Sequence, residues 1–264
     1  MPLFHLVILA LVQGLTEFIP VSSSAHLILP AQLFEGFEDQ GTGIDVAAHV
    51  GSLGAVMLYF RREMRDLVRG AGQVLRLRPG AEGRLLLLLA AATVPFLIVA
   101  AALALSGVAD ALRDPLVIAW ASIGFGLVLW LADRTPQRLT RLPDRVGPAV
   151  AIGLAQCLAL IPGTSRSGIT MTAARFLGYD RTGAARFSML LSIPTIAASG
   201  LYLATDLGEG GGTALGPALI VAALSFGAAY LAIDLFLRLT RSVSYTPFVI
   251  YRIALGAVLL VMFA

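Results

Sequence analysis

Long apolar stretches constrain this chain more than any other feature of its sequence. Of its 264 residues, 58% are hydrophobic and only 13% are charged, whereas soluble domains carry about 25% charged residues. This leaves too little polar surface to cover a water-soluble globule, and we predict an all-α polytopic membrane protein. A spanning helix needs about 20 mostly apolar residues, and six uninterrupted stretches meet this need: residues 44–60, 85–105, 115–131, 187–205, 215–237 and 247–263.

Charge and cysteine content exclude other broad classes. The net charge of +3 comes from arginines that cluster between the apolar stretches rather than along one face, so we expect no nucleic-acid partner. Cys157 is the single cysteine, which excludes a disulfide framework and a metal site made of several cysteines. No basic residues precede the apolar segment that starts at Leu6. We therefore expect this segment to be part of the mature fold rather than a cleaved signal peptide.

Arginine clusters orient the predicted spans, because cytoplasmic loops of membrane proteins are enriched in basic residues. The loops 61–84 and 133–145 are both rich in arginine, which places them inside, and the link with Arg238 and Arg241 lies inside as well. Residues 206–212 contain acidic residues and no base, which suits the outside. We therefore expect both chain termini outside.

Two further apolar stretches are interrupted in the middle. Residues 3–34 are broken at residues 20–24, and residues 149–177 are broken at residues 162–168. Each half is too short to cross as a helix that rises 1.5 Å per residue. The orientation of the flanking loops requires each stretch to leave on the side where it entered, the first outside and the second inside. The sequence thus predicts six transmembrane helices plus two re-entrant helical hairpins.

The two interrupted stretches resemble each other. Residues 10–20, Ala-Leu-Val-Gln-Gly-Leu-Thr-Glu-Phe-Ile-Pro, parallel residues 153–162, Gly-Leu-Ala-Gln-Cys-Leu-Ala-Leu-Ile-Pro, with a one-residue gap. Hairpins that enter from opposite faces form an inverted-topology repeat, which places a site near the midplane of the membrane. We expect one integral membrane domain over residues 1–264, with repeat one at about 1–132 and repeat two at about 148–264.

The breaks carry the groups expected of a buried anion site. Non-helical backbone at membrane depth is tolerated only inside protein or beside a wet cavity. Pro20 and Pro162 are expected to end the preceding helices, because proline lacks an N–H and restricts the residue before it. The helices that start after the breaks would then point free N–H groups at one place, which favours an anion. Arg166 in the second break can form bidentate hydrogen bonds to a phosphate.

Titratable side chains accompany the first break. Gln13 and Glu17 are four residues apart and share one helical face. An ionised side chain at membrane depth costs about 2.5–3.5 kcal/mol, so Glu17 needs a partner: Arg166, a divalent cation, or a serine hydroxyl that it deprotonates. His26 adds an imidazole, a group that titrates near neutral pH. A carboxylate, hydroxyls, an imidazole and a guanidinium around an anion site indicate phosphoryl transfer.

These residues belong to two motifs that carry a family resemblance. Residues 13–26, Gln-Gly-Leu-Thr-Glu-Phe-Ile-Pro-Val-Ser-Ser-Ser-Ala-His, resemble the first signature of the undecaprenyl-diphosphate phosphatase family, also called bacitracin resistance proteins. Residues 162–168, Pro-Gly-Thr-Ser-Arg-Ser-Gly, resemble its second signature. Residues 187–194, Phe-Ser-Met-Leu-Leu-Ser-Ile-Pro, and residues 245–252, Tyr-Thr-Pro-Phe-Val-Ile-Tyr-Arg, extend the resemblance over nearly the whole chain.

The resemblance implies hydrolysis of undecaprenyl diphosphate to undecaprenyl phosphate and inorganic phosphate, which recycles the lipid carrier of cell-wall synthesis and confers bacitracin resistance. It implies a divalent cation (Mg²⁺ or Ca²⁺), no organic cofactor, and a multi-pass protein of the bacterial inner membrane whose site opens to the periplasm. Two positions depart from the family pattern: Gln13 replaces the first glutamate of the signature, and Ala25 replaces a common glycine. Gln13 cannot be a general base, which leaves Glu17 as the only carboxylate of that pair.

Roles for Glu17, Ser23, His26 and Arg166 follow as hypotheses. Ser23 is the first choice of nucleophile, activated by Glu17 or His26, because a free hydroxyl is a poor nucleophile. His26 could instead be the acid, the base or the nucleophile, and direct attack by water is a further alternative. Arg166 would neutralise the transferring phosphoryl group, and Glu17 could also hold a metal ion. The other polar or glycine residues of the motifs are expected to bind substrate: Gln13, Ser22, Ser24, Gly163, Thr164, Ser165, Ser167, Gly168 and Thr170.

The same side chains have structural interpretations. Ser22 could cap a helix, Glu17 and Arg166 could form a purely structural ion pair, and His26 could be a packed polar residue. Asp45 and His49 lie four residues apart at the start of a span. They could line the outer mouth of the cavity or anchor the helix in the membrane interface.

A transporter is the alternative function. Inverted repeats with broken helices are common in transporters, and a flippase for the undecaprenyl phosphate carrier would use the same phosphate site. Binding alone, however, does not require Glu17, Ser23 and His26 to lie together. A homodimer is compatible with Gly124 and Gly126, two small residues on one span that allow close helix contact.

Overall fold

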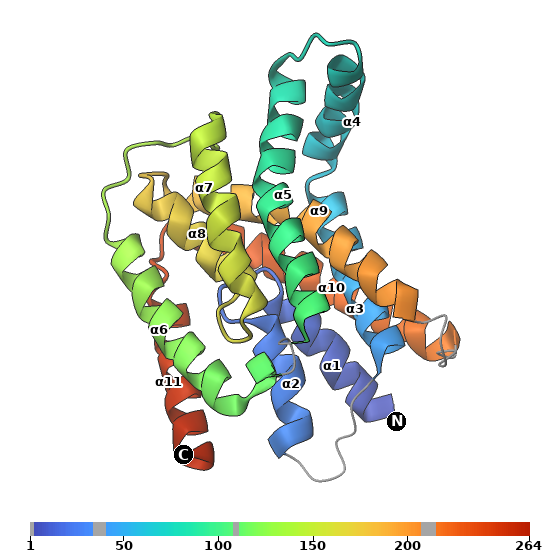
Figure 1. The fold of residues 1–264 in the computed structure, drawn as a ribbon, viewed down its shortest axis with the longest axis vertical. Coiled ribbons are helices and arrows are strands. Elements are labelled where there is room, and N and C mark those ends of the chain that lie inside the picture. The colour runs from blue at the N-terminus through green and yellow to red at the C-terminus, as the bar shows by residue number, and fades with distance from the viewer. Residues whose placement is uncertain (1–2, 34–40, 108–110, 207–214) are drawn as a thin grey trace.

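The structure, a computed structural model, describes residues 3–33, 41–107, 111–206 and 215–264. Within these ranges the named elements are all helices (Figure 1), and Leu139 and Tyr179 form an isolated β-bridge. The helices are α1 (Leu3–Thr16), α2 (Ser23–Leu33), α3 (Thr42–Tyr59), α4 (Arg61–Leu75), α5 (Ala81–Ser106), η1 (Ala111–Arg113), α6 (Pro115–Asp133), α7 (Val146–Gln156), η2 (Cys157–Leu160), α8 (Arg166–Phe176), α9 (Arg181–Asp206), α10 (Leu215–Leu239) and α11 (Thr246–Phe263).

The prediction of an all-helical protein with long apolar spans is confirmed. Among the described residues, α5, α6, α9, α10 and α11 are long and apolar enough to cross a membrane, and a sixth span is reached if α3 and α4 count as one bent helix. Their outward faces carry large apolar side chains, such as Ile98, Leu231 and Val261, that are 64%, 69% and 87% exposed. Such faces suit lipid as the surrounding solvent.

The sequence analysis predicted a loop at the arginine-rich segment 61–84, but the structure shows that most of this segment is helical. Helix α4 occupies most of it and bends away from α3 by 87°. Its apolar side chains Met64 and Leu67 pack against the core, while its arginines lie on the outer face. The Gln73 side chain accepts hydrogen bonds from the N–H groups of Gly80 and Gly83, at 2.9 and 3.1 Å, and so fixes the turn into α5. Helix formation wins here because the segment has an apolar stripe at helical spacing.

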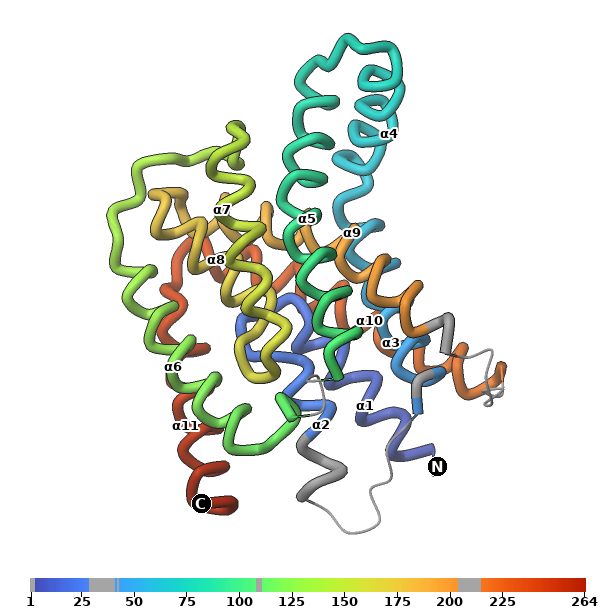
Figure 2. The backbone as a smooth tube through the Cα atoms, viewed as in Figure 1, coloured from blue at the N-terminus to red at the C-terminus, as the bar shows by residue number. Residues whose placement is uncertain are grey.

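Two helix–break–helix units contain the interrupted stretches. Helices α1 and α2 flank the break at residues 17–22, and α7 with η2 precedes the break at residues 161–165, after which α8 begins. Figures 1 and 2 show α1 and α7 starting toward opposite ends of the molecule and the two breaks meeting near its middle. Helix α1 packs on α10, and α7 packs on α5. Each unit therefore lies against a long helix from the other predicted half of the chain.

Glycine permits these two contacts. A Cβ atom added to Gly14 of α1 would lie 2.5 Å from the Ser225 carbonyl oxygen on α10. A Cβ atom on Gly153 of α7 would lie 2.2 Å from the Ala92 carbonyl oxygen on α5. Small residues let helix backbones approach closely in membranes, where packing replaces the hydrophobic effect as the driving force. Gly126 faces Arg252 of α11 within the same chain, which leaves it no surface for the dimer contact considered above.

A buried charge cluster joins the ends of four helices away from the two breaks. Asp133 had been expected in a cytoplasmic loop, but it is the last residue of α6 and only 6% exposed. Its carboxylate accepts hydrogen bonds from Arg181 at 2.6 and 3.0 Å and from the Tyr245 N–H at 3.0 Å. Arg175 of α8, fully buried, lies 3.7 Å away. Asp133 therefore fixes the starts of α9 and α11 to the ends of α6 and α8.

The contact between α7 and α5 gives a stability prediction. Gly153→Ala should lower the stability of the purified protein in detergent by about 1–3 kcal/mol, the usual cost of overpacking, because the new methyl group meets the Ala92 carbonyl. Gly147→Ala on the same helix is the control, since a Cβ there would meet nothing within 4 Å. Thermal unfolding of the two variants measures the difference. Equal stability would show that α7 is not seated on α5.

Candidate functional site

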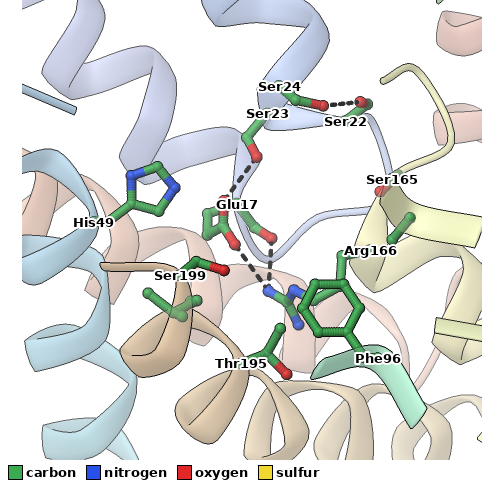
Figure 3. A pocket seen from close by; sticks show the side chains of 12 residues that line it. Glu17, Ser22, Ser23, Ser24, His49, Phe96, Ser165, Arg166, Thr195 and Ser199 are labelled. Atoms are coloured by element: carbon green, nitrogen blue, oxygen red, sulfur yellow. Dashed lines mark hydrogen bonds and ion pairs between the residues drawn. The ribbon is translucent and has the colours of Figure 1, made fainter. Parts of the chain in front are cut away.

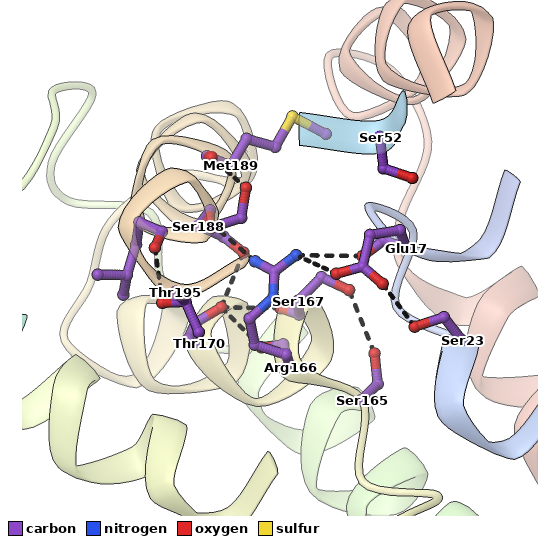
Figure 4. Close-up of polar contacts among 12 residues, drawn as sticks. Glu17, Ser23, Ser52, Ser165, Arg166, Ser167, Thr170, Ser188, Met189 and Thr195 are labelled. Carbon is purple, nitrogen blue, oxygen red and sulfur yellow. Dashed lines mark hydrogen bonds and ion pairs between the residues drawn. The ribbon is translucent and has the colours of Figure 1, made fainter. Parts of the chain in front are cut away.

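Hydrogen bonds join the two breaks directly. The Gly163 N–H donates to Ser22 Oγ at 3.2 Å, and the Ser167 hydroxyl donates to the Ile19 carbonyl at 2.8 Å. Arg166 adds an ion pair with Glu17 (Figure 4). The expectation that the two polar segments meet inside the protein therefore matches the geometry.

The two breaks share an unusual backbone. Ser22 and Ser165 each precede a helix and adopt positive φ values of 74° and 69°, a region that residues other than glycine rarely enter. The hydroxyl of each lies 3.2 Å from that of the serine two residues later, Ser24 or Ser167. Strained backbone of this kind persists where the surroundings over-determine it, often at functional sites.

Pro20 and Pro162 were expected to end the preceding helices, but both helices end before them. Helix α1 ends at Thr16 and α7 at Gln156, so Pro20 and Pro162 both lie farther along, within or at the edge of the breaks. The physical reason is that side chains from elsewhere satisfy the carbonyl groups of the breaks. Arg166 donates to the Glu17 carbonyl at 3.3 Å. Arg252 of α11 donates to the Gly163 and Thr164 carbonyls at 2.9 and 2.8 Å. Buried carbonyl groups need such partners once a helix stops.

Glu17 lies at the centre of the site and is 8% exposed. Its Oε1 accepts from Arg166 Nη2 at 3.0 Å, and its Oε2 accepts from Ser23 Oγ at 2.7 Å. Gln13 Nε2 also donates to Oε2, at 3.0 Å, across the expected four-residue spacing. The carboxylate thus has a cation on one oxygen and a hydroxyl on the other, two of the three partners that the sequence analysis left open.

Arg166 reaches across the junction from the first residue of α8. Besides Glu17, its guanidinium donates to the Ser188 carbonyl of α9 at 3.2 Å. A guanidinium carries five N–H donors in a planar fork, so donors remain for a ligand. The ion pair holds the side chain with 11% exposure at the edge of a cavity.

The cavity has a volume of about 220 Å³. Pockets that enclose drug-sized ligands usually measure about 300–1,000 Å³, so this one admits a small polar group rather than a long-chain lipid. Figure 3 shows Glu17, Ser23 and Arg166 on its wall, with His49 turned toward Glu17. Its lining comprises Glu17, Ser22, Ser23, Ser24, His49, Phe96, Ala159, Ser165, Arg166, Thr195, Ile196 and Ser199.

His26 is not brought into the cavity. Its Nδ1 lies 2.7 Å from the Ser22 carbonyl, and its Nε2 lies 2.5 Å from the Tyr251 hydroxyl of α11. The His26 and Tyr251 rings stack with their centroids 5.6 Å apart. These contacts with the Ser22 carbonyl and with Tyr251 hold the His26 ring outside the cavity lining. The structure thus separates His26 from the other three candidates.

The residues expected to bind substrate divide into two groups. Ser22, Ser24 and Ser165 line the cavity. The Ser165 hydroxyl also accepts from the Gly168 N–H at 3.1 Å and so caps α8, which removes that N–H from the donors expected for an anion. The other predicted contacts lie behind the cavity wall and support it: Gln13, Gly163, Thr164, Ser167, Gly168 and Thr170.

Helix α9 supplies cavity residues that the sequence analysis did not identify. Thr195, Ile196 and Ser199 line the cavity from α9, and Phe96 lines it from α5. The signal was available as a spacing, because Ser188, Ser192, Thr195 and Ser199 follow one another at intervals of four, three and four residues, which places their hydroxyls on one helical face. Of the two residues considered for the cavity mouth, His49 is among the residues that line the cavity and Asp45 is not.

The side chains do not fit a preformed metal site. In the described part of the chain, no group of three or more histidine, cysteine or acidic residues is arranged to hold a metal ion. Glu17 is the one carboxylate among the cavity residues, and both of its oxygens already accept hydrogen bonds. Hard divalent cations prefer several oxygen ligands, more than this wall offers.

The fold and site define a polytopic helical membrane protein with a carboxylate, a guanidinium and a serine hydroxyl between two broken helices. The chain belongs to the family described as Bacitracin resistance protein BacA, which matches residues 6–258. It is similar to proteins named undecaprenyl-diphosphatase from Ruegeria pomeroyi, 53% identical over 265 residues and 98% of each chain, and from Maricaulis maris, 52% identical over 268 residues and 100% of each chain. A protein from Stutzerimonas stutzeri named undecaprenyl-diphosphatase 2 is 50% identical over 275 residues, covering 100% of this chain and 99% of the relative.

The ion pair gives a prediction about stability that is independent of activity. Arg166→Met leaves the Glu17 carboxylate buried without its cation and should cost about 3 kcal/mol, near the lower end for a broken buried pair. Adding Glu17→Gln should recover part of that loss, because no unpaired charge remains. Unfolding of the single and double variants in detergent measures the coupling.

Arg238→Ala is the matched control for the ion pair. Arg238 pairs with Asp234 at 2.8 Å but is 73% exposed, and exposed pairs contribute about 0–1 kcal/mol. A double variant that is less stable than Arg166→Met would contradict the assignment of the pair.

Proposed function

We propose that this protein hydrolyses undecaprenyl diphosphate to undecaprenyl phosphate and inorganic phosphate, and so returns the lipid carrier to cell-wall synthesis. Relatives that are named undecaprenyl-diphosphatase match this chain over nearly their full length. The observation that carries the proposal is the contact of Ser23 with Glu17 and of Glu17 with Arg166 on one cavity wall. A nucleophile beside a base and a phosphate-binding cation is the arrangement that phosphoryl transfer requires.

Ser23 is the nucleophile in this proposal. Its hydroxyl donates to Glu17 Oε2 at 2.7 Å, so the carboxylate is positioned to take the proton as the oxygen attacks the terminal phosphorus. The bond from that phosphorus to the bridging oxygen breaks, and undecaprenyl phosphate leaves. Water then hydrolyses the phosphoserine and releases inorganic phosphate.

Arg166 stabilises the charge that develops on the transferred phosphoryl group. Arg166 lines the same cavity as Ser23, and an arginine fork matches phosphate oxygens in a bidentate way. Preorganised donors of this kind are each worth about 10²–10³-fold in rate. The hydroxyls of Ser22, Ser24 and Ser165 line the cavity beside it and can donate to the other phosphate oxygens.

The cavity is large enough for the diphosphate headgroup but not for the prenyl chain, which remains among the apolar helix faces. A divalent cation, Mg²⁺ or Ca²⁺, is proposed to arrive with the diphosphate rather than to occupy a resident site. Magnesium ions are commonly held by one or two carboxylates together with substrate phosphates. Glu17 is the one carboxylate among the residues that line the cavity, and it would have to exchange a present hydrogen bond for such a contact.

The membrane topology proposed for this function has six crossings and two re-entrant hairpins, formed by α1–α2 and α7–α8. The arginines of α4 and of residues 134–145 lie at one end of the molecule, which is the cytoplasmic end by the positive-inside rule. Both termini and the mouth of the cavity then face the periplasm of a bacterial inner membrane.

The activity is tested with purified protein in detergent, where no membrane sidedness exists. Wild type should release inorganic phosphate from undecaprenyl diphosphate. Glu17→Gln should lower kcat by about 10²–10⁴-fold, as expected for loss of a general base, and Arg166→Ala by about 10²–10³-fold. Ser242→Ala, at an exposed serine after α10, should match wild type. A wild-type protein that binds the lipid but releases no phosphate would favour a flippase.

The nucleophile is tested by trapping. Wild-type protein mixed with substrate labelled in the terminal phosphate should carry label on Ser23 when it is quenched in acid, and Ser23→Ala should carry none. Parallel samples are quenched in alkali, because acid would remove a phosphohistidine. Label that is stable in alkali but lost in acid would instead point to a phosphohistidine. An unlabelled wild-type protein during rapid turnover would contradict the covalent route and favour direct attack by water.

The topology is tested by labelling with a membrane-impermeant maleimide in a Cys157→Ala background. Leu105→Cys, at a position 90% exposed near the end of α5, should react in intact spheroplasts. Arg78→Cys, exposed in the turn between α4 and α5, should react only after lysis. The reverse pattern would place the arginine-rich end outside and overturn the proposed orientation.

A further inference from the structure

His49 brings an imidazole to the cavity from a third element. It lies on α3, whereas Glu17, Ser23 and Arg166 come from the two breaks and the helices after them. Figure 3 shows its ring on the cavity wall, turned toward Glu17. The function proposed above uses the carboxylate, the serine and the guanidinium, but leaves this ring without a role.

The backbone fixes the tautomer of His49. Its Nδ1 lies 2.8 Å from the Asp45 carbonyl oxygen one turn earlier on α3. A carbonyl oxygen only accepts hydrogen bonds, so the proton of the neutral ring must lie on Nδ1. The lone pair is then on Nε2, which has no hydrogen-bond partner among the described residues. His49 therefore presents a basic nitrogen to the cavity.

His26 has no such nitrogen to offer. Its Nδ1 is likewise engaged by a carbonyl oxygen, that of Ser22, and the lone pair of its Nε2 accepts from the Tyr251 hydroxyl. Both ring nitrogens of His26 are thus occupied outside the cavity. Of the two histidines near the site, His49 is the one arranged to accept a proton from a molecule inside it.

We propose that His49 is a catalytic residue, the general base for the water that hydrolyses the phosphoserine. The inference rests on the covalent route proposed above. Glu17 has taken the Ser23 proton in the first step and cannot serve as the base for a second one, so the water needs another acceptor. His49 and Ser23 line the same cavity, so a water that attacks a phosphorus bound to Ser23 lies in the space that the His49 ring borders.

The second step balances as follows. A water oxygen forms a bond to the phosphoserine phosphorus and loses a proton to His49 Nε2. The bond from the phosphorus to Ser23 Oγ breaks, and this oxygen regains the proton held by Glu17. Inorganic phosphate leaves, and His49 gives its proton to solvent. One water is consumed for each diphosphate cleaved, and all the side chains return to their starting states.

The test separates the two chemical steps. In a rapid-quench experiment with double-labelled undecaprenyl diphosphate, His49→Ala and His49→Gln should release about one equivalent of undecaprenyl phosphate per protein in a normal first turnover. Release of inorganic phosphate should then be slower by about 10²–10⁴-fold, as for loss of a general base. Labelled phosphoserine should accumulate, and added imidazole should restore phosphate release in His49→Ala.

Two further variants make the result specific. Val50→Ala, at the neighbouring exposed position on α3, controls for perturbation of the helix and should turn over like wild type. His49→Gln keeps the size of the side chain but has no basic nitrogen, so it remains informative if His49→Ala fails to fold.

Normal release of inorganic phosphate by His49→Gln, or slow turnover without any phosphoserine, would overturn the role of His49. A failure of the proposed function looks different, because wild type itself would then form no undecaprenyl phosphate.

Discussion

The ion pair between Glu17 and Arg166 is the interaction on which the rest of the site depends. Each charge alone would be costly at membrane depth, where even lenient scales assign about 2.5–3.5 kcal/mol to an ionised side chain. Together, at 3.0 Å, they neutralise each other and connect two breaks that come from opposite ends of the molecule. The carboxylate then has its second oxygen free to accept from Ser23. The same two side chains therefore connect the two breaks and position the Ser23 hydroxyl.

The two breaks have the same backbone geometry but carry different side chains at the equivalent position. Ser22 and Ser165 have matching positive φ values, and each hydroxyl lies 3.2 Å from that of the serine two residues on. The residue between them starts the next helix and faces the junction, and it is Ser23 in the first break and Arg166 in the second. A repeated geometry thereby brings a serine hydroxyl from one break and a guanidinium from the other to the same cavity. Arg252 of α11 holds the second break in place through its hydrogen bonds to the Gly163 and Thr164 carbonyls.

Much of the fold and part of the site could be predicted from the sequence. The spacing of Gln13 and Glu17, the arginine in the second break and the serines after the first were all readable, because they depend on local helical periodicity and on the cost of charge in lipid. Three features of the structure could not be predicted from the sequence. Arg61 starts a helix rather than a loop, Asp133 is buried, and the helices stop before Pro20 and Pro162. Each depends on a distant partner, such as Gln73 for the α4–α5 turn and Arg252 for the second break, and a single sequence does not show which distant residues will meet.

The sequence by itself determined that this protein is an all-helical membrane protein, that two polar breaks interrupt its apolar stretches, and that Glu17, Ser23 and Arg166 belong to them. These properties follow from composition and short-range spacing, which lipid solvation restricts severely. Only the tertiary structure decided which histidine faces the cavity. His26 is near Ser23 in the chain but bonds to Tyr251, whereas His49 comes from α3 with an Nε2 that has no hydrogen-bond partner in the described part of the chain. Side-chain direction at a junction of several helices is set by packing between segments far apart in sequence, and proximity along the chain does not reveal it.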